Sequence, residues 1–233
     1  MVNFVVFERV RSVGSPVLLS AALVAFAVEP PAGQPPAADL ARALQRKYEQ
    51  VRDFSASFEH AYEGGVLRTR VTERGTVLVK KPGRMRWTYT TPERKVFVSD
   101  GRRFYSYLPE DRQVIVSPVA PADEAGSPAL FLAGQGDLLR DFTPSAPEVT
   151  GLTASQVALK LVPVRPQRDY DWIVLVLDRR SLQIERLITT DAQGGTSTFT
   201  FSDWRDNVGL PDKAFTFTVP RGVDVITDES RSR

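Results

Sequence analysis

The 233-residue sequence contains no cysteine and a single histidine, His60. Without a thiol the chain can form no disulfide bond, no zinc–thiolate site and no cysteine nucleophile, and it lacks the lipid-attachment cysteine of a bacterial lipoprotein. A single imidazole also excludes most histidine-based metal sites and catalytic triads. The sequence therefore indicates a function outside thiol and multi-histidine chemistry.

Recognisable catalytic and nucleotide-binding motifs are also missing. There is no G-x-S-x-G, S-x-x-K or H-E-x-x-H motif and no Walker A loop, and Gly134 and Gly136 lack the third glycine of a dinucleotide-binding turn. The 30 basic and 28 acidic residues give a formal net charge of +2, with no long run of one sign. We therefore expect a protein that is not an enzyme, uses no cofactor or metal and binds no nucleic acid.

The N-terminus has the pattern of an export signal. A basic flank at Arg9 and Arg11 precedes the apolar stretch 17–26, which is shorter than the ~20 residues needed to span a bilayer. Ala25-Phe26-Ala27 supplies the small-x-small pattern of signal peptidase sites. Residues 1–27 are predicted to be a cleavable signal peptide that directs the protein to the periplasm; a membrane anchor is disfavoured because Glu29 and Pro30 end the apolar run.

Two further segments follow the predicted signal. Residues 28–38 contain four prolines among small residues and are predicted to be a linker, which leaves 39–233 as a single domain. Asp39 is the expected N-cap of an amphipathic helix. The apolar stripe of that helix is formed by Leu40, Leu44, Tyr48 and Val51.

From Asp53 onward the apolar period changes from near 3.6 to 2, which indicates strands. Phe54, Ala56 and Phe58 share one predicted strand face, and the alternation in 84–90 places Met85, Trp87 and Tyr89 together on one face. Further strands are expected at 96–99, 103–108, 113–117, 156–164, 170–177, 182–190, 196–204 and 214–219. Short helices are expected at 127–132 and 137–142.

The resulting pattern is about eleven strands and three helical pieces. It favours a single antiparallel sheet, long enough to curl into a barrel or half-barrel, because a parallel sheet would need a helix between successive strands. Residues 172–177 are apolar on both faces, so one face needs a covering element. The short helices at 127–142 are candidates for that cover, either of a ligand cavity or of a dry core.

Two sets of titratable residues stand out. His60 could act as a base for a serine or an aspartate, although a lone histidine is more often a solvated strand residue. Asp169 and Asp171 share a predicted strand face and could bind a cation, although a charged entrance to a strand is the more common role. Neither set has a spacing that specifies a reaction.

Four segments carry a resemblance to a known family: 53–58, 79–87, 98–101 and 214–223. In this order and spacing they resemble the outer-membrane lipoprotein carrier protein family, LolA, and the resemblance extends from about Leu40 to Ile226. It implies an incomplete, half-open antiparallel β-barrel with an apolar inner surface and a lid of short α-helices. It also implies a periplasmic chaperone that carries acylated lipoproteins from an inner-membrane LolCDE-type ABC transporter to an outer-membrane receptor or acceptor.

The resemblance also implies functional residues, each of which could instead serve core packing. The acyl-chain cavity would be lined by Phe54, Phe58, Met85, Trp87 and Tyr89, with Leu130, Phe131, Leu138 and Leu139 in the lid. The family commonly has arginine before the proline of the 81–83 loop as a lid latch, and here that residue is Lys81. Lysine offers a point charge instead of a planar fork, so the latch should be weaker and the lid easier to open.

Other functions remain open at this stage. A periplasmic lipid-binding or envelope-sensing protein could share the fold without ferrying lipoproteins. An exported hydrolase with an unrecognised site is a further alternative. In each case the mature chain is expected to be a monomer, because it is nearly neutral and has no second apolar run of membrane length.

Overall fold

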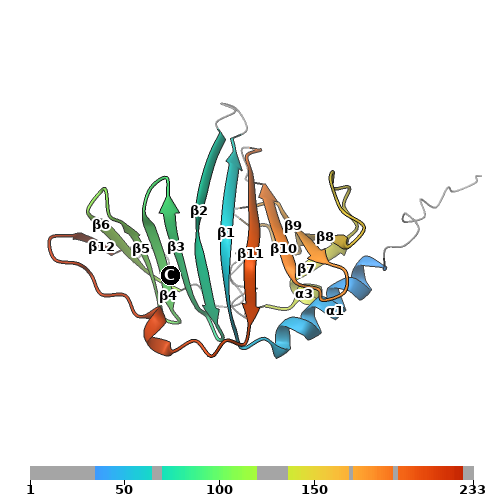
Figure 1. Ribbon diagram of the computed structural model, residues 1–233, viewed down its shortest axis with the longest axis horizontal. Helices are drawn as coiled ribbons and strands as arrows, with labels where there is room; N and C mark the ends of the chain where they lie inside the picture. The colour runs from blue at the N-terminus through green and yellow to red at the C-terminus, as the bar shows by residue number, and fades with distance from the viewer. Residues whose placement is uncertain (1–34, 65–69, 120–135, 168–169, 191–193, 228–233) are drawn as a thin grey trace, which may run out of the picture. The chain divides into compact units, whose positions relative to one another are not determined.

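Twelve strands form one sheet in the computed structural model, which describes residues 35–64, 70–119, 136–167, 170–190 and 194–227 (Figure 1). The order across the sheet is β12-β6-β5-β4-β3-β2-β1-β11-β10-β9-β8-β7. The strands are β1 (Asp53–Glu63), β2 (Arg70–Lys80), β3 (Arg84–Thr91), β4 (Lys95–Asp100), β5 (Arg103–Leu108), β6 (Gln113–Pro118), β7 (Phe142–Ser145), β8 (Gln156–Pro163), β9 (Trp172–Asp178), β10 (Ile184–Thr190), β11 (Thr196–Asp206) and β12 (Asp224–Thr227). The pair β12–β6 is parallel and the other neighbouring pairs are antiparallel. Because β12 and β7 each pair on one side only, the sheet is open.

This architecture confirms the predicted fold class, with corrections at the C-terminus. No strand was predicted at the positions of β2, β7 and β12, and the count of about eleven included one at 214–219. The strand expected at 214–219 is wrong: Asp212–Phe215 forms a 3-10 helix, η1, and the residues after it are extended without strand pairing. Side-chain bonds hold this segment instead, because Arg86 donates to the carbonyl oxygens of Ala214 at 2.7 Å and Thr216 at 2.8 Å.

The first helix, α1 (Ala37–Gln50), begins at Ala37, and Pro36 occupies its N-cap position. The predicted N-cap, Asp39, instead lies in the first turn, where its carboxylate accepts a hydrogen bond from Arg42. An acidic residue there faces the positive end of the helix dipole, so the same side chain stabilises the helix in a different way. Leu40, Leu44 and Tyr48 are buried, as the apolar stripe predicted.

The helix expected at 137–142 is confirmed as the single turn α3 (Leu138–Asp141). Asp137 caps it by accepting hydrogen bonds from the backbone amides of Leu139 and Arg140, both at 2.9 Å. The backbone amide of Leu138 donates to Gln45 of α1 at 3.2 Å, so α3 is attached to α1. The helix expected at 127–132 lies outside the described residues.

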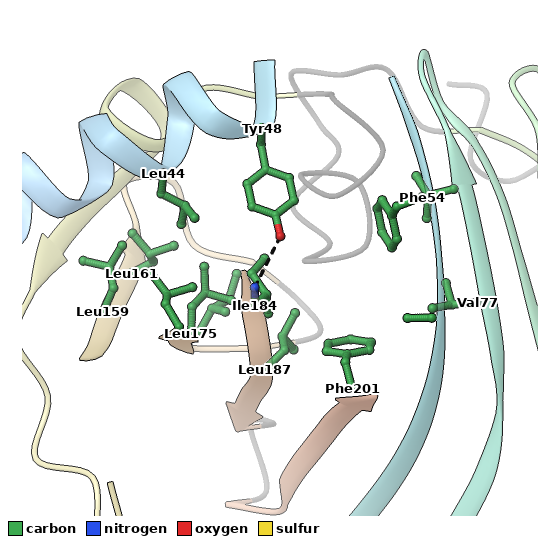
Figure 2. Packing of buried hydrophobic residues seen from close by; sticks show 14 of the residues in the cluster. Leu44, Tyr48, Phe54, Val77, Leu159, Leu161, Leu175, Ile184, Leu187 and Phe201 are labelled. Carbon is green, nitrogen blue, oxygen red and sulfur yellow. Dashed lines mark hydrogen bonds between the residues drawn. The ribbon is translucent and has the colours of Figure 1, made fainter. Parts of the chain in front are cut away.

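The main core lies between α1 and one face of the sheet (Figure 2). Leu44 and Tyr48 of α1 pack with the inward side chains of β8 to β10, among them Leu159, Leu175 and Ile184. The hydroxyl of Tyr48 accepts a hydrogen bond from the amide of Ile184 at 3.4 Å. Burying a large apolar side chain stabilises a fold by about 1.5–3 kcal/mol, so the apolar packing of Leu44 and Tyr48 is the main attachment of α1.

Strand β9 is covered on both faces, as its continuous apolar sequence requires. Ile173, Leu175 and Leu177 belong to the main core, whereas Val174 and Val176 form a second cluster with Ala158. Val149 and Leu152, from the segment before β8, pack against this second cluster. Among the described residues, α1 and this segment therefore provide the cover that the sequence assigned to the helices at 127–142, together with Leu138 of α3.

Glycine is required at one point of the sheet, at the register shift between β2 and β3. A Cβ atom on Gly75 would lie 2.1 Å from the backbone oxygen of Thr88 and 2.8 Å from the ring of Phe58. Only a residue without a side chain permits this approach. The absence of a side chain at Gly75 thus lets β3 and the Phe58 ring pack closely in the middle of the sheet.

Candidate functional site

Aromatic side chains gather on the core-facing side of β1, β3 and β11, which we call the aromatic face. The ring of Phe58 makes edge contacts with Trp87, at 5.1 Å between centroids, and with Tyr89, at 4.9 Å. Phe54 stacks on Trp204 at 4.2 Å. Edge-to-face and stacked pairs of this kind are favourable for aromatic rings.

The structure brings together the sequence-predicted residues of β1 and β3. Phe54, Phe58, Met85, Trp87 and Tyr89 are all buried and all belong to the main core cluster. Alternation grouped them within each strand and the family resemblance joined the two groups; the pairing of β1 and β3 with β2 places them on one face. Whether they line a ligand cavity stays a prediction.

Besides Trp204, two further aromatic residues of this face, Phe199 and Phe201, were missed by the sequence analysis. Phe199 lies 5.5 Å from Trp87 and 6.0 Å from Phe58, and Phe201 lies 6.4 Å from Trp87, between ring centroids. Both come from β11, which pairs directly with β1 although they are far apart in sequence. The alternation in 196–204 identified the strand, but not its neighbour.

The predicted lid residues fall into three groups. Leu138 is fully buried in the main core, whereas Leu139 is 39% exposed. Leu130 and Phe131 lie outside the described residues. Within α3, therefore, one leucine serves the core and the next faces away from it.

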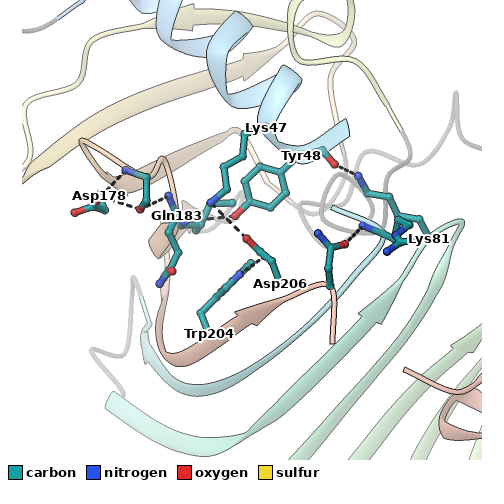
Figure 3. Close-up of polar contacts among 11 residues, drawn as sticks. Lys47, Tyr48, Lys81, Asp178, Gln183, Trp204 and Asp206 are labelled. Carbon is teal, nitrogen blue, oxygen red and sulfur yellow. Dashed lines mark hydrogen bonds and ion pairs between the residues drawn. The ribbon is translucent and has the colours of Figure 1, made fainter. Parts of the chain in front are cut away.

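Lys81 contacts the first helix. Its Nζ donates a hydrogen bond to the backbone oxygen of Tyr48, near the C-terminus of α1, and its backbone amide donates to Arg52 at 2.9 Å (Figure 3). Burial lowers the pKa of the Lys81 ammonium, while Glu49 and Asp206 act in the opposite direction. The cation also lies at the negative end of the helix dipole. Lys81 thus fastens α1, whereas the sequence assigned it to the lid at 127–142.

A polar network surrounds this end of α1 (Figure 3). Asp206 accepts a hydrogen bond from the indole of Trp204 at 2.7 Å, and its carboxylate lies 3.7 Å from Lys47. Asn207 accepts from the amide of Arg52 at 2.8 Å. The end of β11 is therefore bonded to the junction between α1 and β1. No local sequence signal could identify the contacts of Lys47 with Asp206 and of Arg52 with Asn207, which join residues more than a hundred positions apart.

The single histidine is part of a side-chain network on β1, β2, β4 and β11. His60 Nδ1 lies 3.2 Å from Glu73 and its Nε2 lies 3.3 Å from the hydroxyl of Ser197, while Lys95 donates to the other oxygen of Glu73 at 2.6 Å. The ring stacks on Phe199 at 4.1 Å. Burial lowers the pKa of His60. The expectation of a solvated strand residue is therefore wrong.

This network has the order of a hydrolytic triad but not its surroundings. A carboxylate only accepts, so neutral His60 donates from Nδ1 to Glu73 and accepts from Ser197. Ser197 lies in a strand that is paired on both sides, so the neighbouring backbone amides are engaged in the sheet. An oxyanion hole requires such donors to be free and convergent. We therefore interpret the network as structural.

No cation site is visible in the part of the chain that the structure describes. Asp169 lies outside the described residues, so its predicted pairing with Asp171 is untested. The described residues contain no group of three or more histidine, aspartate or glutamate side chains that could hold a metal. Nor does a helix among them have the length and apolarity to cross a bilayer.

Comparisons with known proteins agree with the open, mainly β fold. Residues 49–218 match the family described as "Outer membrane lipoprotein carrier protein LolA". An outer-membrane lipoprotein carrier protein of Cupriavidus pinatubonensis is 30% identical over 88% of this chain and 94% of its own. Its counterpart from Methylococcus capsulatus is 31% identical over 82% and 84%. An uncharacterized conserved protein of Thermus thermophilus shares the fold, with a TM-score of 0.50 and 12% identity over 81% of this chain and 99% of its own.

Proposed function

This chain belongs to the outer-membrane lipoprotein carrier protein family, LolA, and from that premise we propose that it is a periplasmic chaperone that carries acylated lipoproteins to the outer membrane. The acyl chains would bind over the aromatic face, in contact with Phe54, Phe58, Met85, Trp87 and Tyr89. Leu130, Phe131, Leu138 and Leu139 would form the movable cover. Residues 1–27 would direct export and be removed.

The observation that carries this proposal is the extent of the aromatic face on an open sheet. Burying one methylene group is worth ~0.8 kcal/mol, so an acyl chain of about 14 methylenes costs on the order of 10 kcal/mol to expose to water. A soluble carrier must cover that surface with apolar groups. Aromatic and methionine side chains do so through dispersion contacts, which hold the chain without the directional bonds that would hinder its release.

Loading and release need partners, since the sequence contains no recognisable nucleotide-binding motif. We propose that an inner-membrane ABC transporter of the LolCDE type supplies the energy for loading. An outer-membrane receptor or acceptor would then take the lipoprotein. The carrier itself would cycle as a monomer between the two membranes.

Movement of α1 would accompany loading. At the C-terminal end of the helix, Lys81 donates a hydrogen bond to the carbonyl oxygen of Tyr48, beside the ion pair of Lys47 with Asp206 and the buried side chain of Tyr48 itself. A carrier that must open needs a closed state only a few kcal/mol more stable than the open one. The Lys81 contact supplies part of that difference, since a hydrogen bond from a charged group contributes about 1.5–3 kcal/mol.

The test is to identify what the protein holds in its own envelope. The mature chain would be isolated from the periplasm without detergent, and bound material identified by mass spectrometry. We expect intact acylated lipoproteins, in a quantity that falls when Trp87 and Phe201 are both replaced by serine. The control is a variant in which Lys95 and Val96 of β4 are both replaced by serine. It shows how much loading falls when the sheet is weakened away from the aromatic face.

The alternatives give different results in the same experiment. Free lipids in place of lipoproteins would indicate a lipid-binding or envelope-sensing protein of the same fold. Products of ester cleavage that disappear in a Ser197→Ala variant would indicate a hydrolase. Either result would contradict the proposed carrier function.

A further inference from the structure

An apolar groove lies on the face of the sheet opposite the aromatic face. Side chains alternate along β5: Phe104 stacks on Phe97, which packs against the main core, so Tyr105 and Tyr107 face the other way. Phe217, from the extended segment after η1, covers both tyrosines, with ring centroids 5.4 Å and 5.5 Å away. The chain then returns as β12 beside β6, at the edge of the sheet (Figure 1).

The space between the returning segment and β12 is about 660 Å³. Its floor is formed by Tyr105, Val116 and Pro118, and its walls by Phe217, Val219 and Val225. Val219 is 36% exposed and Val225 is 53% exposed, which is unusual for large apolar side chains that line a common surface. The volume lies within the range of small-molecule sites, about 300–1,000 Å³.

Two arginines complete the lining of this groove. Arg102 and Arg103 are exposed, and neither guanidinium forms an ion pair with any residue in the described part of the chain. The nearby carboxylate of Asp100 is occupied otherwise: it accepts the backbone amides of both arginines at 2.8 Å and the hydroxyl of Tyr105 at 3.3 Å. The turn is thereby fixed, while both charged groups stay available.

We propose that this groove binds a single-chain anionic amphiphile, such as a long-chain fatty acid. The carboxylate would accept hydrogen bonds from Arg102 and Arg103, and the hydrocarbon chain would lie along Phe217, Val219 and Val225. An apolar slot with unpaired guanidinium groups matches an apolar chain with one negative end. This site is separate from the aromatic face, and the proposal does not depend on the carrier function.

The experiment measures binding of palmitate to residues 28–233, by calorimetry below the critical micelle concentration of the fatty acid. The double variant Arg102→Gln/Arg103→Gln should bind at least about tenfold more weakly, which is the loss expected for charge-assisted hydrogen bonds. The matched control Arg46→Gln/Arg94→Gln removes the same charge from exposed positions elsewhere and should bind as the native protein does. Methyl palmitate, which lacks the charge, should not distinguish the two variants.

A second measurement locates the ligand and guards against a misfolded variant. Palmitate carrying a diazirine at its chain end should label peptides from 105–118 and 217–227 after irradiation of the native protein. Labelling of β1, β3 or β11 instead would place the fatty acid on the aromatic face and overturn the proposal. Equal binding of palmitate by Arg102→Gln/Arg103→Gln and by the control Arg46→Gln/Arg94→Gln would overturn it as well.

Vesicles distinguish a dissolved amphiphile from a membrane surface. Vesicles of phosphatidylglycerol and phosphatidylcholine should not bring the native protein to the top of a flotation gradient. If they do, and the arginine variant fails to float while dissolved palmitate does not bind, the occupant is a bilayer and the single-chain proposal is wrong.

Discussion

At the scale of single residues, two partly buried bases show how strongly long-range contacts alter a side chain's role. Lys81 precedes a loop proline, and His60 lies near the end of a strand, so both have sequence surroundings typical of solvated residues. Each instead meets a partner from a distant part of the chain: the carbonyl of Tyr48 in one case, and Glu73 with Ser197 in the other. Both bases can be tested by substitution.

Replacing Lys81 should change how readily α1 opens. Lys81→Leu removes the hydrogen bond to Tyr48 and should lower the free energy of unfolding by about 1–2 kcal/mol, with faster uptake of a fluorescent apolar probe. Lys81→Arg adds planar donors and should slow uptake and lipoprotein transfer. Lys213→Leu, at an exposed position in η1, is the matched control. If probe uptake and lipoprotein transfer are unchanged in both Lys81 variants, the hydrogen bond from Lys81 to α1 does not control opening.

His60 should make stability depend on pH in a defined direction. Burial lowers its pKa from 6.5, against the opposing effect of Glu73 and with a smaller contribution from Lys95; Tyr89, Ser197 and Phe199 also face the ring. Near pH 6 the unfolded chain therefore binds more protons than the folded one, so stability falls as pH falls through about 6.5.

The corresponding measurement is urea unfolding at pH 7.5 and pH 5.5. Native protein should lose more stability between these values than the His60→Gln variant, in which the amide can still bond to Glu73. Since the carboxylates titrate in both proteins, the difference between them isolates the imidazole. An equal or larger loss in His60→Gln would show that the folded state does not disfavour the imidazolium.

At the scale of elements, the short helix α3 has a buried and an exposed leucine at adjacent positions, so a role in core packing and a role in loading can be tested separately. Leu138 is fully buried beneath α1 and Leu139 is 39% exposed. Leu138→Glu should cost several kcal/mol, because a buried carboxylate without a partner is strongly unfavourable. Leu139→Glu should leave the thermal unfolding midpoint nearly unchanged, yet reduce loading of lipoproteins if α3 belongs to the cover.

Both quantities can be measured on the same preparations, by calorimetry and by loading with a purified lipoprotein. A loss of loading in Leu139→Glu with native stability would assign α3 to the cover. If loading is lost only in proportion to stability, the predicted lid role of Leu139 is wrong. Substitution of Leu130 or Phe131 by glutamate is predicted to act as Leu139→Glu does.

The sequence predicted most elements, and each exception has a physical cause. Alternation identified β1, β3 and the central strands because each has one face in the core and the other partly exposed. The same alternation at 214–219 predicted a strand, but Phe215 and Phe217 pack on the sheet's opposite face while Arg86 binds the backbone. Strands of four residues, such as β7 and β12, are too short for a period to be visible.

The candidate site was predictable within strands and unpredictable between them. Alternation placed Phe58 and Trp87 each on the apolar face of its own strand, and only the family resemblance put the two faces together, as the pairing of β1 and β3 with β2 does. Phe199 and Phe201 required the pairing of β1 with β11, which nothing local encodes. For the same reason the contact of Lys81 with Tyr48 was not foreseen from the sequence.

At the scale of the whole molecule, the two edges of the open sheet bear on self-association. Edge strands present unpaired backbone groups that can join copies of a chain. Strand β7 is short and contains Pro144, and β12 has only four residues, so neither offers a long pairing surface. Residues 28–233 are therefore expected to be monomeric without detergent. Light scattering across a hundredfold concentration range tests this, and a concentration-dependent dimer would contradict it.

The pairing of β1 with β11 also sets an order of assembly. Phe54 lies opposite Asp206 and Glu63 opposite Thr196, so this seam joins residues synthesised far apart in time. The meander β2 to β6 needs only local hairpins, whereas the seam cannot form until β11 has been synthesised. During that interval the aromatic rings of β1 and β3 face water without their β11 partners. At that stage the chain exposes the same apolar side chains that are proposed to cover the acyl chains of a lipoprotein.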